Sequence, residues 1–474
     1  MLLILSAVVL VLARWLPPGA RRTATTAAGA VLVPTAAALV LLGPRWQMAP
    51  VFAGAALAAP FALSPLLRRR TGRRPAGRVR WWWAVPGSAV CLSLIAMGPA
   101  AAWALPVPVF PEPSGRYPVG TSVMQWTDPD RPETATADPD DRRTVVGQFW
   151  YPAREHPAGA ERARYLGRTA REARTVSDAL ADYAGLPGFL LHGASRAHTR
   201  AVPDAEAATG GGAFPVVLFS PGLGGVRTQN TAWAEELASR GYVVVALDHP
   251  YDSAAVVLDD GRTIRTKVAA TGDDEKDDKL AAEHTKVRAA DLGFVLTRLS
   301  VTDGSGAPPR LAGRLDTGRV AVTGHSLGGG AALQAAHQDR RFDAVINLDG
   351  YPHDPAPRPF RQPALALTQV IGPQTDPDYI PRLTRVLDLG TATSYRLAVP
   401  GTAHLTFTDA PLYLPPLPSL VGSPGRTEGP RLTAALCAAF LDTTLRSGQN
   451  GPDDLPAYLA DHGDLSVHGP GTGS

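Results

Sequence analysis

Cysteine pairs and metal-binding motifs are missing from this sequence. Its 474 residues include two cysteines, Cys91 and Cys437, which lie far apart in the chain. Two cysteines exclude a disulfide framework. There is no His-x-x-x-His motif and no cysteine pair of the kind that binds zinc. We therefore expect neither a metal ion nor another cofactor.

Acidic residues and lysine are missing from the first 111 residues. That stretch contains eleven arginines, and the first acid is Glu112. Of the 46 basic residues in the chain, 35 remain for residues 112–474, which carry all 43 acidic residues and a net charge of −8. The overall charge of +3 thus reflects the N-terminal part alone. It gives no reason to expect a nucleic-acid partner.

Long apolar runs fill this N-terminal part, over residues 1–16, 23–42, 49–67 and 81–105. The last three reach the length of about 20 residues that is needed to cross a hydrocarbon core. A signal peptide is the alternative for the first run, but that run lacks a basic start and carries Arg14 late. We predict a transmembrane module over residues 1–105, a bundle of about four helices that anchors the chain in a bilayer.

Arginines between these runs indicate an orientation. Arg21 and Arg22 follow the first run, and seven arginines occupy residues 68–80, whereas Arg45 stands alone between the second and third runs. Loops rich in basic residues remain on the cytoplasmic side. We therefore expect a multi-pass protein of the cell membrane in which everything after residue 105 is extracellular.

The rest of the chain has the pattern of an α/β domain. A proline-rich linker is predicted over residues 106–120, where prolines favour an extended chain. Strands and helices then alternate over residues 121–446, which predicts a mostly parallel sheet. Residues 153–212 are interpreted as an insertion or lid. The polar residues 447–474 are predicted to form a disordered tail.

One stretch matches a nucleophile elbow. Residues 320–336 read as a β-branched strand, a glycine-rich turn and a helix of small residues. Gly324 and Gly328 flank Ser326 in the Gly-x-Ser-x-Gly pattern. Residues without a Cβ let strand and helix approach closely around a strained serine. We interpret Ser326 as a nucleophile; the alternative is a tight connection without chemistry.

A serine nucleophile needs a base and an acid that orients the base, and on such an elbow they follow in the order acid, then histidine. His404, in a glycine-containing loop after the last strand, is the candidate base. Asp349, at the carboxyl end of a predicted strand over residues 344–348, is the candidate acid. The alternatives are His353 and His337 for the base, and Asp343, Asp354 and Asp388 for the acid.

Two backbone amides are candidates for an oxyanion hole. One is the N–H of Leu327, directly after the nucleophile, and the other is the N–H of Leu223 in the glycine-rich loop over residues 220–225. His249, which ends an earlier strand, and Tyr351 are candidate pocket residues. His325 occupies the variable position of the elbow and is expected to point elsewhere.

Four segments together resemble the platelet-activating-factor acetylhydrolase family of the plasma type. They are Phe219-Ser220-Pro221-Gly222-Leu223-Gly224-Gly225, Gly324-His325-Ser326-Leu327-Gly328-Gly329, Asn347-Leu348-Asp349-Gly350 and Gly401-Thr402-Ala403-His404. The intervals of 23 residues from Ser326 to Asp349 and 78 residues to His404 also resemble that family. The resemblance covers about residues 120–445. It implies an α/β-hydrolase fold and calcium-independent hydrolysis of short or oxidised sn-2 acyl chains of phospholipids.

The expected function is therefore that of a membrane-anchored serine esterase acting through an acyl-enzyme. The expected partners are an ester or phospholipid substrate and the bilayer. The alternatives are a general carboxylesterase or polyesterase, an acyltransferase to an envelope alcohol, and a non-catalytic envelope-binding protein that keeps the fold.

Overall fold

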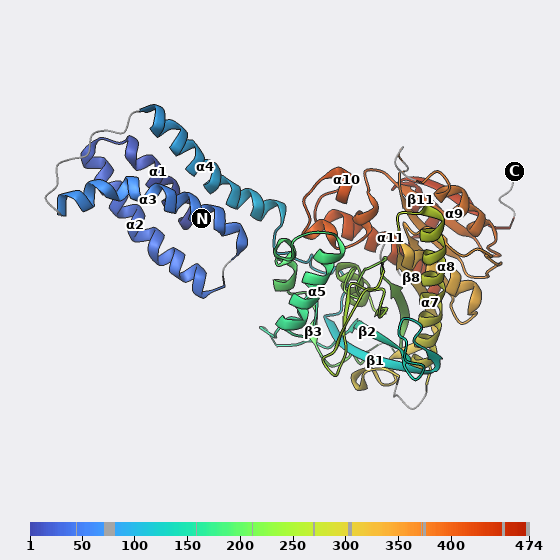
Figure 1. Cartoon of the computed structure of the whole chain (residues 1–474). Helices are drawn as coiled ribbons and strands as arrows, with labels where there is room; N and C mark the ends of the chain where they lie inside the picture. Colours follow the sequence, from blue (N-terminus) through green and yellow to red (C-terminus); the bar gives the residue numbers. More distant parts are fainter. Residues whose placement is uncertain are drawn as a thin grey trace. The chain divides into compact units, whose positions relative to one another are not determined.

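The chain divides into two units, Met1–Pro106 and Val107–Ser474. Figure 1 shows helices in the first unit and a sheet between helices in the second. This computed structural model describes residues 1–43, 45–70, 81–157, 159–210, 212–268, 271–301, 306–370, 372, 376–447 and 451–470, without the side chains of residues 18 and 64–70.

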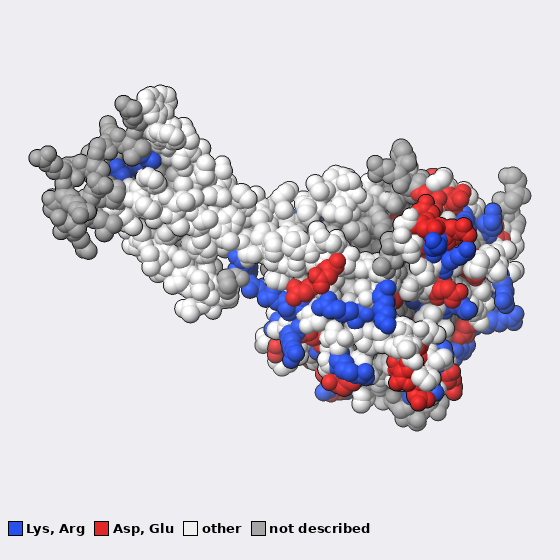
Figure 2. Space-filling view, in the orientation of Figure 1, with Lys and Arg blue, Asp and Glu red and all other residues white. Residues whose placement is uncertain are grey.

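The described part of the first unit contains the helices α1 (Leu2–Leu12), α2 (Pro18–Leu41), α3 (Ala49–Arg70) and α4 (Trp81–Ala104). Its described segments that are long and apolar enough to cross a membrane, judged by length and composition, are Gly19–Leu41, Trp46–Leu63 and Trp81–Ala104; Leu2–Trp15 is apolar but shorter. White, uncharged residues dominate the face of this unit in Figure 2. The apolar helices are therefore present, whereas membrane insertion stays a prediction.

Small residues bring α3 and α4 together. A Cβ on Gly54 would lie 2.7 Å from the Cys91 carbonyl oxygen, and one on Gly98 would lie 2.4 Å from the Val51 side chain. Such close approach at glycine is how helices commonly pack in bilayers. The arginines at positions 68–80, on which the predicted orientation mainly rests, have side chains outside the described residues.

The proline-rich stretch belongs to the second unit from Val107 onward. The Phe110 side chain is 1% exposed, and its ring centroid lies 4.8 Å from that of Tyr165. The Arg200 guanidinium donates to the Phe110 carbonyl oxygen at 2.9 and 2.6 Å. The segment predicted as a proline-rich linker over residues 106–120 therefore belongs to the second unit from Val107 onward and packs against it at Phe110. Prolines keep this segment extended, but the apolar residues between them pack against the fold.

A ten-stranded sheet lies at the centre of the described part of the second unit, in the order β12-β11-β10-β9-β8-β4-β5-β2-β1-β3. The strands are β1 (Val119–Pro132), β2 (Arg142–Pro152), β3 (Val202–Pro203), β4 (Phe214–Ser220), β5 (Val243–Asp248), β8 (Leu315–His325), β9 (Ala344–Leu348), β10 (Ala364–Gln369), β11 (Ser394–Val399) and β12 (Asp464–His468). A separate hairpin pairs β6 (Ala255–Val257) with β7 (Thr263–Arg265). The strands from β11 to β5 run parallel, whereas β2 and β12 pair antiparallel to their neighbours. The predicted mostly parallel sheet is confirmed.

Helices cover both faces of the sheet. Val216 and Leu218 of β4 face a core shared with α7 (Asp274–Leu299), α8 (Leu327–Gln338) and α9 (Tyr379–Asp388). Val217 and Phe219 face a second core with α6 (Thr231–Ser239), α11 (Glu428–Leu445) and α12 (Leu455–Ala460). Strands buried on both faces are continuous apolar runs, which made them recognisable in the sequence. The loops after β4, β8, β9 and β11 leave the same edge of the sheet, where sites are built in such folds.

The C-terminal segment is folded over its described residues 451–470, so the prediction of a disordered tail over 447–474 is wrong there. Leu455 and Leu459, one turn apart on α12, are buried in the second core. The following strand β12 pairs with β11, with Leu465 opposite Leu397. The buried leucines of α12 and the pairing of β12 with β11 thus order a segment that is rich in polar residues.

Residues 153–212 form a packed cap in their described part. The helix α5 (Ala170–Tyr183) begins at Thr169, whose hydroxyl accepts a hydrogen bond from the Glu172 N–H at 3.1 Å. Its buried face packs with Phe110 and Leu412 from distant parts of the chain. The insertion is therefore an integral layer of the second unit, and a role as a lid stays a prediction.

Candidate active site

The elbow residue Ser326 lies between β8 and α8 with φ 54° and ψ −126°. A positive φ is unusual for a residue that carries a Cβ and marks local strain. The Ser326 N–H donates to the Leu348 carbonyl oxygen at 2.9 Å, and the Ser326 carbonyl oxygen accepts from the Gly329 N–H at 2.9 Å. Backbone bonds to β9 and within α8 thus hold the strained conformation.

The glycines on either side of this serine stand where there is no room for a side chain. A Cβ on Gly324 would lie 2.1 Å from the Gly328 carbonyl oxygen, and a Cβ on Gly328 would lie 2.1 Å from the Ser220 carbonyl oxygen. Strand, helix and the loop after β4 therefore meet more closely than any side chain permits. This approach places the loop of residues 220–225, hereafter the oxyanion loop, beside Ser326.

Asp349 follows β9 in a turn that Asn347 shapes. The Asp349 backbone has φ 49°. The Asn347 side chain accepts from the Gly350 N–H at 2.7 Å and donates to the Gly350 carbonyl oxygen at 2.8 Å. Asparagine commonly stabilises such turns through its side-chain amide. This role of Asn347 is not among the predictions made from the sequence.

Both oxygens of the Asp349 carboxylate have hydrogen-bond partners. His404 Nδ1 lies 2.7 Å from Asp349 Oδ2, and Oδ1 accepts from the Gln369 N–H at 3.1 Å and the Tyr379 hydroxyl at 3.2 Å. Burial, together with the neighbouring Asp349 carboxylate, holds the pKa of Tyr379 well above its ordinary value, so Tyr379 remains a donor. With Nδ1–H donated to Asp349, the Nε2 atom of His404 is the nitrogen left to accept a proton.

The alternative acids and bases have other partners. These contacts are His353–Asp278 at 2.9 Å, His337–Asp354 at 2.7 Å, His468–Asp388 at 2.8 Å, and the Val320 N–H to Asp343 Oδ2 at 2.9 Å. None of these pairs includes Ser326, Asp349 or His404. The structure thus brings Asp349 and His404 together beside the strand that precedes Ser326. The alternative acids and bases instead form hydrogen bonds with other residues.

The amides of Leu223 and Leu327 have no acceptor among the described residues. Leu327 is the first residue of α8, and leading helical N–H groups lack an intrahelical acceptor. Leu223 follows Gly222, at which a Cβ would lie 3.4 Å from the Ser326 Cβ. Two unused donors near one serine are the arrangement that stabilises an oxyanion.

His325 connects two loops rather than pointing away from the site, so that expectation is wrong. Its Nδ1 lies 2.8 Å from Gln229 Nε2, and its Nε2 lies 3.0 Å from the His404 carbonyl oxygen. Because a carbonyl only accepts, Nε2 carries the proton and Nδ1 accepts from the Gln229 amide. Gln229 in turn accepts from the Gly222 N–H at 3.0 Å. The loop after β11 folds back over the end of β8, which makes this contact.

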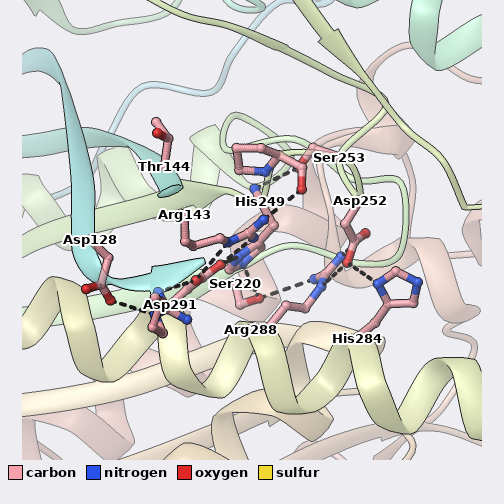
Figure 3. Close-up of polar contacts among 12 residues, drawn as sticks. Asp128, Arg143, Thr144, Ser220, His249, Asp252, Ser253, His284, Arg288 and Asp291 are labelled. Atoms are coloured by element: carbon pink, nitrogen blue, oxygen red, sulfur yellow. Dashed lines mark hydrogen bonds and ion pairs between the residues drawn. The ribbon is translucent and has the colours of Figure 1, made fainter. Parts of the chain in front are cut away.

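His249 is 0% exposed and does not line a pocket, contrary to the prediction. His249 follows β5 and lies against α7. Its Nε2 lies 2.9 Å from Ser220 Oγ, and its Nδ1 lies 2.7 Å from Asp291 Oδ2 on α7 (Figure 3). Tyr351 is half-buried and stacks on Tyr379 at 5.8 Å between ring centroids. Its role in a pocket stays a prediction.

Two buried arginines complete the polar network in Figure 3. Arg288 pairs with Asp252 at 2.6 Å, and Arg143 pairs with Asp291 at 2.6 Å. Burial alone would raise the pKa of Asp291, but the Arg143 charge and the bond with His249 lower it, so the carboxylate stays ionised. These residues are not among those predicted from the sequence. The available signal was charge at Arg288 and Asp291 on the otherwise apolar stripe of α7.

The described residues contain no group of three His, Cys, Asp or Glu side chains that could hold a metal ion. The acids nearest the oxyanion loop, Asp252 and Asp291, have arginine partners instead.

Apolar side chains flank the catalytic edge. A Cβ on Gly224 would lie 2.4 Å from the Tyr183 ring, so the end of α5 covers the oxyanion loop, and the exposed Leu186 and Phe189 follow it. On the other side, the Thr406 hydroxyl ties the His404 turn to α10 (Pro418–Val421) at 2.9 Å. Residues 410–425 contain no charged side chain, and the surface over α10 is white in Figure 2. An uncharged stretch of chain therefore lies beside the His404 turn.

The buried His325 gives a pH prediction. Burial and the neighbouring His404 hold its pKa well below the ordinary value, so below about pH 6.5 only the unfolded chain gains a proton at this residue. Stability is then lost as the pH falls. Relative to His325→Gln, the wild type should lose up to about 1.4 kcal/mol of unfolding free energy between pH 8 and pH 5.5, measured by urea denaturation. Equal losses in both proteins would contradict this.

Comparison with known proteins agrees with the geometry. The sequence profile of the family described as platelet-activating factor acetylhydrolase, isoform II, matches residues 107–423. A probable 1-alkyl-2-acetylglycerophosphocholine esterase of Arthroderma benhamiae is 27% identical over 247 residues, which cover 51% of this chain and 59% of the relative. The platelet-activating factor acetylhydrolase of Cavia porcellus is 32% identical over 152 residues, covering 29% and 35%. The chain thus spans about three fifths or less of these relatives.

A solved structure extends the likeness to the whole fold. The ferulic acid esterase from Streptomyces cinnamoneus is 28% identical, with a TM-score of 0.59, and the match covers 75% of this chain and 98% of that one. The profile match covers more than half of the chain and confirms the resemblance noted in the sequence. The chain belongs to the platelet-activating factor acetylhydrolase, isoform II, family.

Proposed function

We propose that the second unit is a serine esterase that cleaves carboxylic esters through an acyl-enzyme. Ser326 attacks the ester carbonyl while His404 Nε2 takes its proton, and Asp349 holds the imidazole by its Nδ1–H. The Leu223 and Leu327 amides stabilise the oxyanion, and His404 then returns the proton to the leaving alcohol. The observation that carries the proposal is the 2.7 Å contact between His404 Nδ1 and Asp349 Oδ2 at the edge where Ser326 sits on a strained elbow.

The proposed substrate is a short acyl ester at the sn-2 position of a phospholipid. Family membership and the name of the Arthroderma relative, which specifies a 2-acetyl group, support it. The stretch around α10, residues 410–425, which has no charged side chain, also suits an apolar substrate. The alternative is a general carboxylesterase or polyesterase, which the ferulic acid esterase favours.

We further propose that the first unit anchors the enzyme in a cell membrane, with the second unit outside. The apolar segments of the first unit support the anchoring, and the clustering of its arginines at positions 21–22 and 68–80 supports the orientation. An anchored esterase would remain close to lipids that seldom leave the bilayer.

Removal of the Ser326 hydroxyl tests the mechanism. Ser326→Ala should lower kcat on p-nitrophenyl acetate by roughly 10⁴-fold or more, because no group remains to form the acyl-enzyme. Ser394→Ala is the matched control, since this buried serine begins β11 at the opposite edge of the sheet. A fluorophosphonate should label wild type at position 326. Undiminished turnover by Ser326→Ala would overturn the mechanism, and an unlabelled, inactive wild type would favour a non-catalytic binding protein.

Chain-length preference tests the substrate. We expect kcat/KM for a 1-alkyl-2-acetyl phosphatidylcholine to exceed that for its 2-palmitoyl analogue by about 10- to 200-fold, because a pocket for short acyl chains excludes the longer one. Ethyl ferulate in the same assay represents the carboxylesterase alternative, and higher kcat/KM on it would replace the phospholipid proposal. Ester product exceeding free acid in the presence of an alcohol would instead indicate an acyltransferase.

Reporter fusions test the orientation. Alkaline phosphatase, which is active only outside the cytoplasm, should be active when fused after residue 106 and inactive when fused after residue 75, because the basic loop is retained inside. The reverse pattern would show that the second unit is cytoplasmic.

A further inference from the structure

Arg288 contacts the backbone of the oxyanion loop from within the core. Its side chain is 0% exposed and comes from the middle of α7. One guanidinium nitrogen, Nη2, donates to the Gly222 carbonyl oxygen at 3.0 Å. The other, Nη1, donates to the Pro221 carbonyl oxygen and lies 3.3 Å from the Ser220 hydroxyl. One side chain therefore binds three consecutive residues of the loop.

These contacts also determine the direction in which the amides of the loop point, because the geometry of the peptide bond is fixed. The described residues contain no cis peptide bond, and in a trans peptide the C=O and N–H groups point in opposite directions. The Gly222 carbonyl faces Arg288, so the N–H of Leu223 in the same peptide unit must face away from it. The neighbouring peptide shows the same rule. The Pro221 carbonyl faces Arg288, and the Gly222 N–H faces Gln229 on the other side at 3.0 Å.

The elbow lies close to Gly222, and Gln229, which accepts from the Gly222 N–H, also contacts His325 of the elbow at 2.8 Å. A Cβ on Gly222 would be 3.2 Å from His325 Nδ1 and 3.4 Å from the Ser326 Cβ. Gln229 uses the Gly222 N–H, whereas the Leu223 N–H has no acceptor among the described residues. The loop thus presents the Pro221 and Gly222 carbonyls to Arg288, and the Gly222 carbonyl also accepts from the Gly225 N–H at 2.9 Å, so a turn hydrogen bond and the arginine hold the same peptide.

The position of Arg288 is itself fixed. Asp252 accepts from its Nε at 2.7 Å and from its Nη2 at 2.6 Å. With His249 Nδ1–H donated to Asp291, His249 Nε2 accepts from the Ser220 hydroxyl, which leaves the Ser220 lone pairs for Arg288 (Figure 3). The network therefore sets the direction of each donor around the guanidinium.

We propose that Arg288 is a positioning residue of the oxyanion hole, which fixes the peptide between Gly222 and Leu223 so that the Leu223 amide faces the reacting carbonyl. The inference rests on the proposed esterase function. A buried ion pair with Asp252 alone would require no contact with the loop carbonyls. The carbonyl contacts are what link this arginine to the rate of reaction.

The test compares Arg288→Met and Arg288→Lys with a matched control in the full-length chain in detergent. Arg446→Met is the control, because the Arg446 guanidinium also bridges two successive carbonyls, those of Arg240 and Gly241, and pairs with Asp442. These contacts precede β5, away from the catalytic edge. Measurements are kcat and KM on p-nitrophenyl acetate, thermal stability, and inhibition by a trifluoromethyl ketone, whose adduct with serine places an oxyanion in the hole.

Arg288→Met is expected to lower kcat by about 100-fold with KM changed less than threefold, as for loss of an oxyanion donor. The ketone should lose affinity by a similar factor. Arg288→Lys retains the charge beside Asp252 but reaches fewer acceptors, so it should recover part of kcat. If Arg288→Met does not fold, the kcat of Arg288→Lys tests the inference instead. Arg446→Met should keep kcat even where it lowers the melting temperature.

A folded Arg288 variant with kcat within threefold of wild type would overturn the inference. The inference also fails if Arg446→Met loses as much kcat for an equal loss of thermal stability. Failure of the underlying esterase proposal has a different signature, because the wild type would then be inactive or Ser326→Ala active.

Discussion

The second unit depends on the close approach of three backbone segments around Ser326. Positions 324, 328 and 350 exclude a Cβ, which at Gly350 would lie 2.4 Å from the Ser326 carbonyl oxygen. Packing at this distance forces the serine into a conformation with positive φ, and the hydrogen bonds to β9 and α8 maintain it. The backbone of β9 and α8, rather than the Asp349 and His404 side chains, thus supports the strain.

The polar groups behind the site follow from the same constraint. A loop pressed against the elbow has backbone groups that water cannot reach, and unpaired buried groups are costly. Arg288 binds the Gly222 carbonyl and Gln229 binds the Gly222 N–H, whereas the Leu223 amide has no acceptor among the described residues. Buried ion pairs contribute little net stability on average, because removing two charges from water offsets their attraction. Their value here lies in the direction that they impose on the loop.

Much of this arrangement could be predicted from the sequence, because it is carried by local patterns. The glycines around Ser326 indicated the elbow, and the ends of apolar strands indicated Asp349 and His404. The roles of Gln229, His325 and Arg288 could not be predicted, because they arise where distant elements meet, and nothing local distinguishes Arg288 from a surface arginine except its place on an apolar stripe. Composition was a poor guide at both ends of the second unit. Phe110 and Leu459 are buried there, although the residues around them are mostly proline or polar.

The two units satisfy their charges in different ways. In the second unit, buried arginines such as Arg143 and Arg288 bind carboxylates. The first unit contains no carboxylate side chain at all, and its arginines use other partners: Arg21 donates to the Phe61 carbonyl oxygen at 2.8 Å, and the Arg14 guanidinium lies 5.7 Å from the centroid of the Phe61 ring. Carbonyl and aromatic partners leave the positive charge uncompensated, which is tolerable where water or anionic lipid headgroups lie close by. An acid-free helical unit with such arginines therefore fits the boundary of a bilayer better than the interior of a water-soluble fold, and this contrast supports the anchoring role proposed for it.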